Sequence, residues 1–575
     1  MCGWMVSNYT SGNIASAMKK LAHRGPDSQK YDIVNDLLLA HTRLAVLHLD
    51  EKSNQPLSID NNRYWLIYNG EIYNFKELRD ELLREGLCSE IDLPESDTHL
   101  LAQYLKHKGL ERTVKRLQGM YAFMFLDKVT GNVSIARDPL GIKPLYFVST
   151  DNGITFGSTA KAVAAYNELD MKLNDLSLFA FRKFGFIPDA VNLFSDITIF
   201  PAGGNYFGKL DCFDIVSVTK YKLIDLFDVP QKKTDIKKIE LAIKNTVKKH
   251  LISDVDIGVL LSGGIDSGAL LQYSKREVPD TKAITIYYDE FKNSHNDELT
   301  TAELVAKALK VMHITQKVTV TDFLLDLQNI AKKMDRPTID GINVWFATKV
   351  AKENKIKVVL SGVGVDEFFG GYQTLKMLKT VNRFSILKPI ILPLACLFKA
   401  NKKVQKLFDI LNYNNSFLAQ YLQKRALRTD AQMQESFGYS VKEVQDYMQE
   451  ILNIYNHGEI SNLYHTRGSG VAVAYLETII YMRSQLLLDG DWSSMGQSVE
   501  LRTPFVDLQF LKSINAYLED QSCKGKRNFI EATGRAAAPR KRGSKTGFGI
   551  PIDTWIKKSS TFKKKNWIDQ VETFF

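Results

Sequence analysis

Residues 260–267 read Leu260-Leu261-Ser262-Gly263-Gly264-Ile265-Asp266-Ser267, and this stretch decides the fold of the larger part of the chain. It follows an apolar run at 257–261 and opens a helical pattern at 267–277. A glycine-rich turn between a strand and a helix lets backbone N–H groups and the positive end of the helix dipole meet phosphate groups. The turn lacks the lysine of a Walker loop, which disfavours transfer of a γ-phosphoryl group. The sequence therefore predicts a strand–turn–helix unit that binds nucleotide phosphates.

Further apolar strands and helical patterns follow this unit in alternation. We expect strands at 283–288 and 358–361, with helices at 298–309 and 343–353. Strands that alternate with helices of this length predict a parallel, doubly wound α/β sheet. From about residue 375 onward the pattern is mainly helical.

A second glycine-rich loop ends the strand at 358–361. It reads Ser361-Gly362-Val363-Gly364-Val365-Asp366-Glu367. The carboxyl ends of parallel strands meet at one edge of the sheet, so Asp366 is expected to face the first loop. Carboxylates in that position suit Mg²⁺ held between the protein and phosphate groups. Asp266 and Asp366 are therefore the candidate metal ligands.

The first 210 residues have a different, β-rich pattern. Short apolar runs separated by Gly, Asn and Asp turns occur at 37–39, 65–68, 121–126, 133–136, 145–148 and 155–156. A helical pattern covers 74–85. These runs predict stacked antiparallel sheets with helices outside them. We expect one domain over 2–210, a linker over 211–235, where Pro230 and paired lysines lie, and a second domain over 236–575.

Cys2 has only the initiator methionine in front of it. We expect removal of that methionine, because the next side chain is small, to leave a cysteine at the N-terminus. Such a residue carries both a thiol nucleophile and an α-amine that can take its proton, with a reference pKa of about 7.7–8.0. A separate histidine base is then unnecessary.

Several short motifs follow Cys2 in order. They include Arg24-Gly25-Pro26-Asp27, His41-Thr42-Arg43-Leu44, Asn54-Gln55-Pro56-Leu57, Tyr68-Asn69-Gly70-Glu71-Ile72-Tyr73-Asn74, Glu95-Ser96-Asp97-Thr98, Gly119-Met120-Tyr121-Ala122-Phe123 and Ala136-Arg137-Asp138-Pro139-Leu140-Gly141. Together they resemble the class II glutamine amidotransferase domain over residues 2–165. That family has the N-terminal-nucleophile hydrolase fold, an αββα sandwich.

The resemblance implies a role for each matching residue. Cys2 would be the nucleophile, and the Asn69 side chain with the Gly70 backbone N–H would form the oxyanion hole for glutamine hydrolysis. Donors of this kind are commonly worth about 3 kcal/mol of transition-state stabilisation each. Arg43 would pair with the glutamine α-carboxylate, and Glu71 and Asp97 would bind its α-ammonium group.

The second half resembles ATP pyrophosphatases of the asparagine synthetase family. Its loop at Ser262, Gly263, Gly264, Asp266 and Ser267 is similar to the pyrophosphate loop of that family. The motifs at 498–507 (SVELRTPFVD) and 545–551 (KTGFGIP) extend the resemblance to about residue 556. It implies that Leu261, Ile286, Ser361 and Gly362 contact the nucleotide and that Lys545 stabilises charge on the phosphates or the acyl-adenylate.

The two resemblances together imply a glutamine-hydrolysing asparagine synthetase that uses ATP and Mg²⁺. Glutamine would supply ammonia, and a carboxylate acceptor, aspartate, would be adenylated and converted to its amide with release of AMP and pyrophosphate. Two positions depart from the family pattern: Val363 replaces a glutamate near the reacting acyl group, and Asp340 replaces an arginine. One alternative is therefore the same chemistry on a sugar uronic acid of a surface polysaccharide. Another is a degenerate, non-catalytic family member, against which the matching site residues count.

Composition limits the remaining possibilities. The formal net charge is +10, but no recognition motif accompanies the basic clusters, so a nucleic-acid partner is not expected. The five cysteines are scattered without metal-ligand spacing, which is typical of a cytoplasmic protein. The apolar segment 386–398 contains two prolines and is too short to span a bilayer, so stable membrane insertion is not expected. Family members often form homodimers, so a homodimer is an alternative to a monomer.

Overall fold

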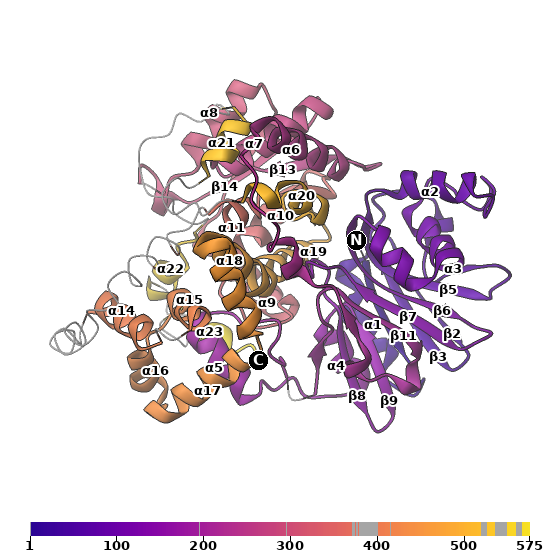
Figure 1. Ribbon diagram of the computed structural model, residues 1–575, viewed down its shortest axis with the longest axis horizontal. Coiled ribbons are helices and arrows are strands. Elements are labelled where there is room, and N and C mark those ends of the chain that lie inside the picture. Colours follow the sequence, from indigo (N-terminus) through magenta and orange to yellow (C-terminus); the bar gives the residue numbers. More distant parts are fainter. Residues whose placement is uncertain are drawn as a thin grey trace.

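The computed structural model describes residues 2–194, 196–294, 296–370, 374, 378, 401–413, 416–518, 526–534, 549–558 and 566–575. Figure 1 shows two parts side by side, a β-rich N-terminal part on the right and a larger α/β part on the left. The N-terminus lies where the two parts meet. The start of the first strand is therefore close to both parts.

The N-terminal part consists of two stacked antiparallel sheets of six strands each. The first has the order β10-β8-β9-β1-β3-β2, with β1 (Cys2–Ser7), β2 (Ser28–Val34), β3 (Leu37–Arg43), β8 (Tyr146–Thr150), β9 (Gly153–Gly157) and β10 (Thr198–Ile199). The second has the order β12-β11-β7-β6-β5-β4, with β4 (Leu57–Ile59), β5 (Tyr64–Ile72), β6 (Gly119–Asp127), β7 (Asn132–Arg137), β11 (Gly204–Lys209) and β12 (Thr219–Lys220). β12 lies within the segment that the sequence suggests as a linker.

Helices cover the outer faces of the two sheets. α1 (Ile14–Leu21) and α4 (Ala160–Asn167) pack on the first sheet, and α2 (Phe75–Arg84) and α3 (Asp97–Arg116) pack on the second. Between the sheets lies an apolar core that includes Trp4, Leu39, Ile67, Met124 and Ile135. This arrangement confirms the predicted αββα sandwich. Because helices cover the outer faces, central strands such as β1, β3 and β6 are buried on both faces, and strands of this kind appear in the sequence as short apolar runs.

The second part is built on a five-stranded parallel sheet. Its order is β15-β14-β13-β16-β17, with β13 (Ile257–Leu260), β14 (Lys282–Tyr287), β15 (His313–Lys317), β16 (Val358–Leu360) and β17 (Glu500–Arg502). The helices associated with it are α6 (Ile236–His250), α7 (Ile265–Glu277), α8 (Leu299–Leu309), α9 (Val320–Lys333), α10 (Ile342–Glu353) and α11 (Val365–Phe369). The predicted parallel sheet is confirmed, and β15 and β17 are two further strands that could not be predicted from the sequence.

The C-terminal region is mainly helical, as predicted. It contains α14 (Lys402–Asn412), α15 (Phe417–Arg425), α16 (Asp430–Phe437), α17 (Val441–Asn453), α18 (His457–Leu476), α19 (Leu488–Gly496), α20 (Leu508–Ile514), α21 (Arg527–Ala532), α22 (Ile552–Lys558) and α23 (Trp567–Glu572). α5 (Asp175–Phe184), which follows the sandwich in the chain, packs against α17.

One long helical stretch runs from His457 to Gly496, with a kink at Gly468, where the backbone is not helical. Its middle, η9 (Glu477–Leu487), is a π-helix, a rare form that often occurs near functional sites. Among the described residues this stretch alone is long and apolar enough to cross a membrane, and 78% of its apolar window is buried inside the protein. Its apolar surface is thus largely covered by the rest of the fold. The apolar segment 386–398 lies outside the described residues.

Candidate active sites

Cys2 begins β1 and is buried, with 8% of its surface exposed. β1 pairs with β3, which places Cys2 opposite Arg43. Burial raises the pKa of the Cys2 thiol, while the charge of Arg43 acts in the opposite direction. The thiol therefore needs a nearby base to become a nucleophile at neutral pH.

Asn69 lies on β5 beside Cys2. The Cys2 backbone nitrogen donates a hydrogen bond to Asn69 Oδ1 over 2.9 Å. The amide nitrogen Nδ2 of Asn69 is buried and finds no hydrogen-bond partner in the described part of the chain. At the adjacent Gly70 a Cβ atom would lie 2.1 Å from the Met120 carbonyl oxygen, so no larger residue fits there. A buried donor without a partner, next to a thiol, suits the oxygen of a tetrahedral intermediate.

Arg43 fixes the loop that follows β3. Its Nη1 donates to the Asp50 carbonyl oxygen and to Asn54 Oδ1, each over 2.8 Å. Its Nη2 donates to the His48 carbonyl oxygen. The guanidinium group is thus held rigidly near Cys2, which suits recognition of a carboxylate.

Two acidic side chains lie near Cys2 on the second sheet and the helix above it. Asp97 Oδ2 accepts hydrogen bonds from the Tyr68 hydroxyl over 3.0 Å and from the Ile72 backbone over 3.2 Å. Glu71 Oε1 is buried and has no hydrogen-bond partner among the described residues. Burial raises the pKa of both carboxyl groups. A bound ammonium group would stabilise their charged forms.

The C-terminal part contributes charges to this site that the sequence analysis missed. Arg502 Nη2 lies 3.4 Å from Glu71 Oε2, and Arg502 Nε lies 2.6 Å from Glu500 Oε1. Burial opposes ionisation of Glu500, but nearby positive charges, Arg502 among them, lower its pKa to about 2. Both residues belong to the motif SVELRTPFVD at 498–507, which can be recognised in the sequence. The contact of this motif with the N-terminal part could not be predicted from the sequence.

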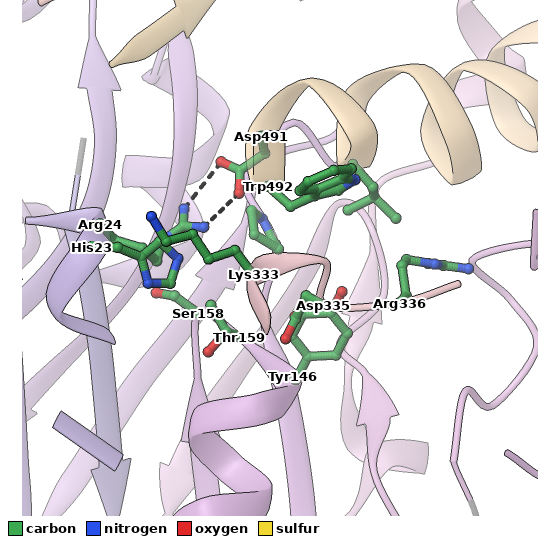
Figure 2. Close-up of a pocket in the computed structure, with 12 residues that line it drawn as sticks. His23, Arg24, Tyr146, Ser158, Thr159, Lys333, Asp335, Arg336, Asp491 and Trp492 are labelled. Carbon is green, nitrogen blue, oxygen red and sulfur yellow. Dashed lines mark hydrogen bonds and ion pairs between the residues drawn. The ribbon is translucent and has the colours of Figure 1, made fainter. Parts of the chain in front are cut away.

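A second contact between the two parts involves Arg24. Its Nε donates to the Cys2 carbonyl oxygen over 3.1 Å, and its Nη1 and Nη2 form a bidentate pair with Asp491 on α19 over 2.7 and 3.1 Å. Figure 2 shows this pair at the edge of a cavity between the two parts, which Lys333, Asp335 and other residues of both parts also line. The nucleophile and α19 are therefore joined through one side chain.

The first phosphate loop has the geometry that its sequence predicts. Gly263 has a φ of +62°, and a Cβ there would lie 2.8 Å from Thr301 Cβ. Ser267 Oγ accepts a hydrogen bond from the Ser262 backbone over 3.2 Å and donates to the Gly264 carbonyl. α7 begins at Ile265, directly after the glycines. A loop of this shape, followed directly by the start of a helix, suits the binding of phosphate oxygens.

The predicted nucleotide contacts lie beside this loop. The Leu261 backbone donates to the Ile284 carbonyl on β14 over 2.8 Å, and the Ile286 side chain is buried. The Ser361 backbone donates to the Arg502 carbonyl over 2.9 Å. A Cβ at Gly362 would lie 3.1 Å from Asp266 Cβ, so the two loops are in direct contact.

The structure brings Asp266 and Asp366 together around one lysine. Lys526 Nζ lies 2.6 Å from Asp366 Oδ1 and also forms an ion pair with Asp266. Nothing in the sequence singles out Lys526, because it is remote from both aspartates in the chain and belongs to no phosphate-loop motif. Lys545 lies outside the described residues.

These two carboxylates fit Mg²⁺. Both are hard oxygen donors on loops at one sheet edge, and both already share a positive partner. Within the described residues no group of three or more His, Cys, Asp or Glu side chains could hold a metal ion.

The two departures from the family pattern lie near this edge. Val363 is half-buried in the second loop and packs against the core. Asp340 immediately precedes Gly341 at the start of α10 and accepts a hydrogen bond from its backbone over 2.8 Å. Neither residue offers a positive charge to a substrate.

Comparison with known proteins agrees with this geometry. Residues 1–213 match the family model described as glutamine amidotransferase domain, and residues 238–563 match the one described as asparagine synthase. The chain is 28% identical to asparagine synthetase (glutamine-hydrolyzing) 1 of Bacillus subtilis, over 96% of this chain and 86% of that protein. It is 26% identical to a putative asparagine synthetase (glutamine-hydrolyzing) of Mycobacterium bovis, over 95% and 85%.

Among solved structures, a glutamine phosphoribosylpyrophosphate amidotransferase from B. subtilis matches with a TM-score of 0.27 and 11% identity, over 57% of this chain and 93% of that one. The resemblance inferred from the motifs is confirmed by the two family matches, the second of which covers more than half of the chain. The chain belongs to the asparagine synthase family and carries a glutamine amidotransferase domain at its N-terminal end.

Proposed function

We propose that this protein hydrolyses glutamine at Cys2 and transfers the ammonia to an acyl-adenylate formed from ATP and a carboxylate. The products are the amide, AMP, pyrophosphate and glutamate. Aspartate is the first acceptor to test, because the relatives from B. subtilis and M. bovis carry the name asparagine synthetase. The glutaminase domain would cover 2–210 and the synthetase domain 236–575, with a linker over 211–235.

The glutaminase step uses the groups around Cys2. The thiol loses its proton to the α-amine that removal of Met1 exposes, and the sulfur attacks the amide carbon of glutamine. The unpartnered Nδ2 of Asn69 and the Gly70 backbone N–H stabilise the oxyanion. The α-amine then protonates the departing ammonia, and water hydrolyses the remaining thioester to glutamate. Arg43 orients the substrate α-carboxylate, and Glu71 and Asp97 hold its α-ammonium group.

The synthetase step uses the edge of the parallel sheet. An oxygen of the acceptor carboxylate attacks the α-phosphorus of ATP and displaces pyrophosphate, which the loop at Ser262, Gly263, Gly264 and Ser267 binds through its backbone. Ammonia then attacks the acyl carbon and displaces AMP. Mg²⁺ held by Asp266 and Asp366 would supply positive charge to the phosphates. Lys545 would add to that charge.

The observation that carries this proposal is the bidentate Arg24–Asp491 pair. Arg24 holds the carbonyl of the nucleophile, and Asp491 belongs to a helix that leads directly into the synthetase sheet. Burying two charges is costly unless they pair, so this contact fixes the position of α19 relative to Cys2. The contact supports transfer of ammonia inside the protein.

The test is release of AMP and pyrophosphate in the presence of ATP, Mg²⁺ and a carboxylate, with glutamine or ammonium as nitrogen donor. We expect Cys2→Ala to abolish the glutamine-dependent reaction and to retain the ammonium-dependent one. Glutamine hydrolysis without AMP release for any carboxylate would contradict the proposal and favour a degenerate family member.

A second candidate acceptor is a sugar uronic acid of a surface polysaccharide. Val363 and Asp340 favour it, because Val363 cannot accept a proton and Asp340 offers no positive charge to the aspartate carboxylates. The same assay with uronic acids tests this alternative.

We further propose that the protein acts in the cytoplasm on these small molecules and forms a homodimer. The cysteines Cys2, Cys88 and Cys212 are all free thiols, as in a reducing compartment. Size-exclusion chromatography with light scattering would test the oligomeric state.

A further inference from the structure

The loop that follows β3 is held by both parts of the protein. Arg43, the last residue of β3, donates hydrogen bonds to the carbonyl oxygens of His48 and Asp50, so the loop wraps around its guanidinium group. The backbone N–H of His48 donates in turn to Asp254 Oδ2 over 2.6 Å. Asp254 belongs to the second part of the chain, and the reaction proposed above gives it no role. A synthetase residue therefore supports the loop around Arg43.

The backbone of His48 makes this support important. Its φ of +50° lies in the left-handed region, which residues other than glycine adopt only at a cost in free energy. Such a conformation persists where the surrounding contacts hold it in place. His48 has two such contacts besides its bond with Arg43, because its Nδ1 also forms a hydrogen bond with Ser53 Oγ over 2.7 Å. The bond with Asp254 thus favours the conformation in which the His48 carbonyl oxygen accepts from Arg43.

Asp254 is itself fixed in place. Its backbone N–H donates to the Val46 carbonyl oxygen over 3.0 Å, so the residue forms two hydrogen bonds with the loop. It lies in the short connection between α6 and β13, and Arg502 Nη1 donates to the His250 and Ile252 carbonyl oxygens of this connection over 2.8 and 2.6 Å. The Asp254 carboxylate is therefore an anchor whose position the synthetase part determines.

The same loop also reaches the other predicted end of the glutamine site. Ser53 Oγ, which bonds with His48, shares a second hydrogen bond with Ser96 Oγ over 3.0 Å. Ser96 is the N-cap of α3 and directly precedes Asp97. A displacement of His48 would therefore affect Arg43 first and could extend to the start of α3. These are the two places from which the substrate α-carboxylate and α-ammonium group would be held.

We propose that Asp254 is a positioning residue for glutamine hydrolysis: it accepts the His48 N–H and so holds Arg43 in the orientation that binds the substrate α-carboxylate. The inference rests on the proposed function and adds a residue of the synthetase part to the glutamine site. Asp254 does not touch glutamine and acts only through His48 and Arg43. Loss of its hydrogen bond should weaken glutamine binding and leave the attack by Cys2 unchanged.

The experiment measures ammonia release by the full-length protein from L-glutamine and from L-glutamine methyl ester, which lacks the α-carboxylate charge. Asp254→Ala should raise the KM for glutamine about fivefold, the factor that one typical hydrogen bond is worth, and should leave kcat within about twofold of the wild-type value. The KM for the ester should change by less than about twofold, because Arg43 has no carboxylate to bind there. The preference for glutamine over the ester should therefore fall. A general loss of stability would affect both substrates alike.

Two further variants serve as controls. Asp254→Asn keeps an oxygen that can accept the His48 N–H, so its KM for glutamine should stay near the wild-type value. Asp256→Ala is the matched control, because Asp256 is an exposed aspartate two residues further along that pairs with Lys282 over 2.7 Å. It should leave the preference for glutamine unchanged. Ammonium-dependent AMP release at the wild-type rate shows that the synthetase part of each variant is folded.

Three results would overturn the inference. Asp254→Ala could leave the preference for glutamine over the ester unchanged, or it could lower kcat without raising KM. Asp254→Asn could have the same raised KM as Asp254→Ala, which would exclude the hydrogen bond as the cause. In all three cases glutamine hydrolysis at Cys2 would stand. A wild-type protein that releases no ammonia from glutamine would instead contradict the proposed function, and this inference with it.

Discussion

Asp491→Asn tests the connection between the two active sites. The substitution keeps the shape of the side chain and removes its charge. Arg24 then loses a bidentate partner in a place where the two side chains are only 2% and 4% exposed. Lys143, whose Nζ lies 3.7 Å from Asp491, also loses a nearby negative charge.

The expected loss can be worked out from this geometry. Breaking a buried ion pair by removing one partner costs about 3–5 kcal/mol, because the remaining charge is left buried. For domains of this size each kcal/mol shifts the melting temperature by roughly 2–4 °C, so the variant should melt roughly 6–20 °C lower. The glutaminase kcat/KM should fall at least about tenfold, because Arg24 no longer holds the Cys2 carbonyl firmly. Differential scanning calorimetry and a glutamate-release assay measure the two effects.

Lys357→Gln is the control for this variant. Lys357 pairs with Asp27 of the N-terminal part over 2.8 Å, but the two side chains are 38% and 32% exposed. An exposed pair is worth about 0–1 kcal/mol, so the melting temperature should change by at most about 4 °C. If Asp491→Asn melted and hydrolysed glutamine like Lys357→Gln, the Arg24–Asp491 pair would have no coupling role and the reasoning would fail.

Three further predictions concern Asn69, Lys526 and two buried histidines. Asn69→Ala should lower the glutaminase kcat by about 100–1,000-fold and leave ammonium-dependent AMP release intact, and an unchanged glutaminase rate would remove Asn69 from the oxyanion hole. Lys526→Met should increase the rise in melting temperature that Mg²⁺ causes, since the ion no longer competes with an ammonium group for Asp266 and Asp366. An equal rise in the wild-type protein would refute that competition. Burial lowers the pKa of His41 and of His250 to about 3 in the folded protein, below a reference of about 6.5. Their stabilising contribution is complete above pH 6.5 and is lost as the pH falls toward 3, by about 1.4 kcal/mol per pH unit each, which urea unfolding at pH 7 and pH 5 would detect.

Much of the fold follows from local sequence patterns. Six strands of the sandwich (β3 and β5–β9) and three of the parallel sheet (β13, β14 and β16) could be predicted, because each has an apolar run bounded by turn residues. β15 was missed because it is mostly polar and exposed. β17 was missed because it has three residues and lies within a polar motif, and its pairing with β16 bridges about 140 residues of chain. The π-helical segment could not be predicted, because its apolar pattern does not differ from that of an ordinary buried helix.

The same holds for the candidate sites: residues in short motifs could be predicted, and contacts between remote segments could not. Cys2, Asn69, Asp266 and Asp366 could be predicted, because each lies in a short motif whose residue types suit one reaction. Lys526 could not, because its partners are about 160 and 260 residues away in the chain. The same is true of the Arg24–Asp491 pair. Interactions between remote segments depend on packing and leave no local signal.

The π-helical segment Glu477–Leu487 has a further consequence for how this protein can vary. It sets the rotation of α19 about its axis, because a π-helix closes its hydrogen bonds one residue later than an α-helix does. Deleting one residue there would turn all that follows by about 100°, the angle between successive residues of an α-helix. Asp489 would leave Thr338, and in the same step Asp491 would leave Arg24. Insertions and deletions in this helix should therefore be rare among close relatives, because a change that moves Asp489 would also disturb the contact with the nucleophile.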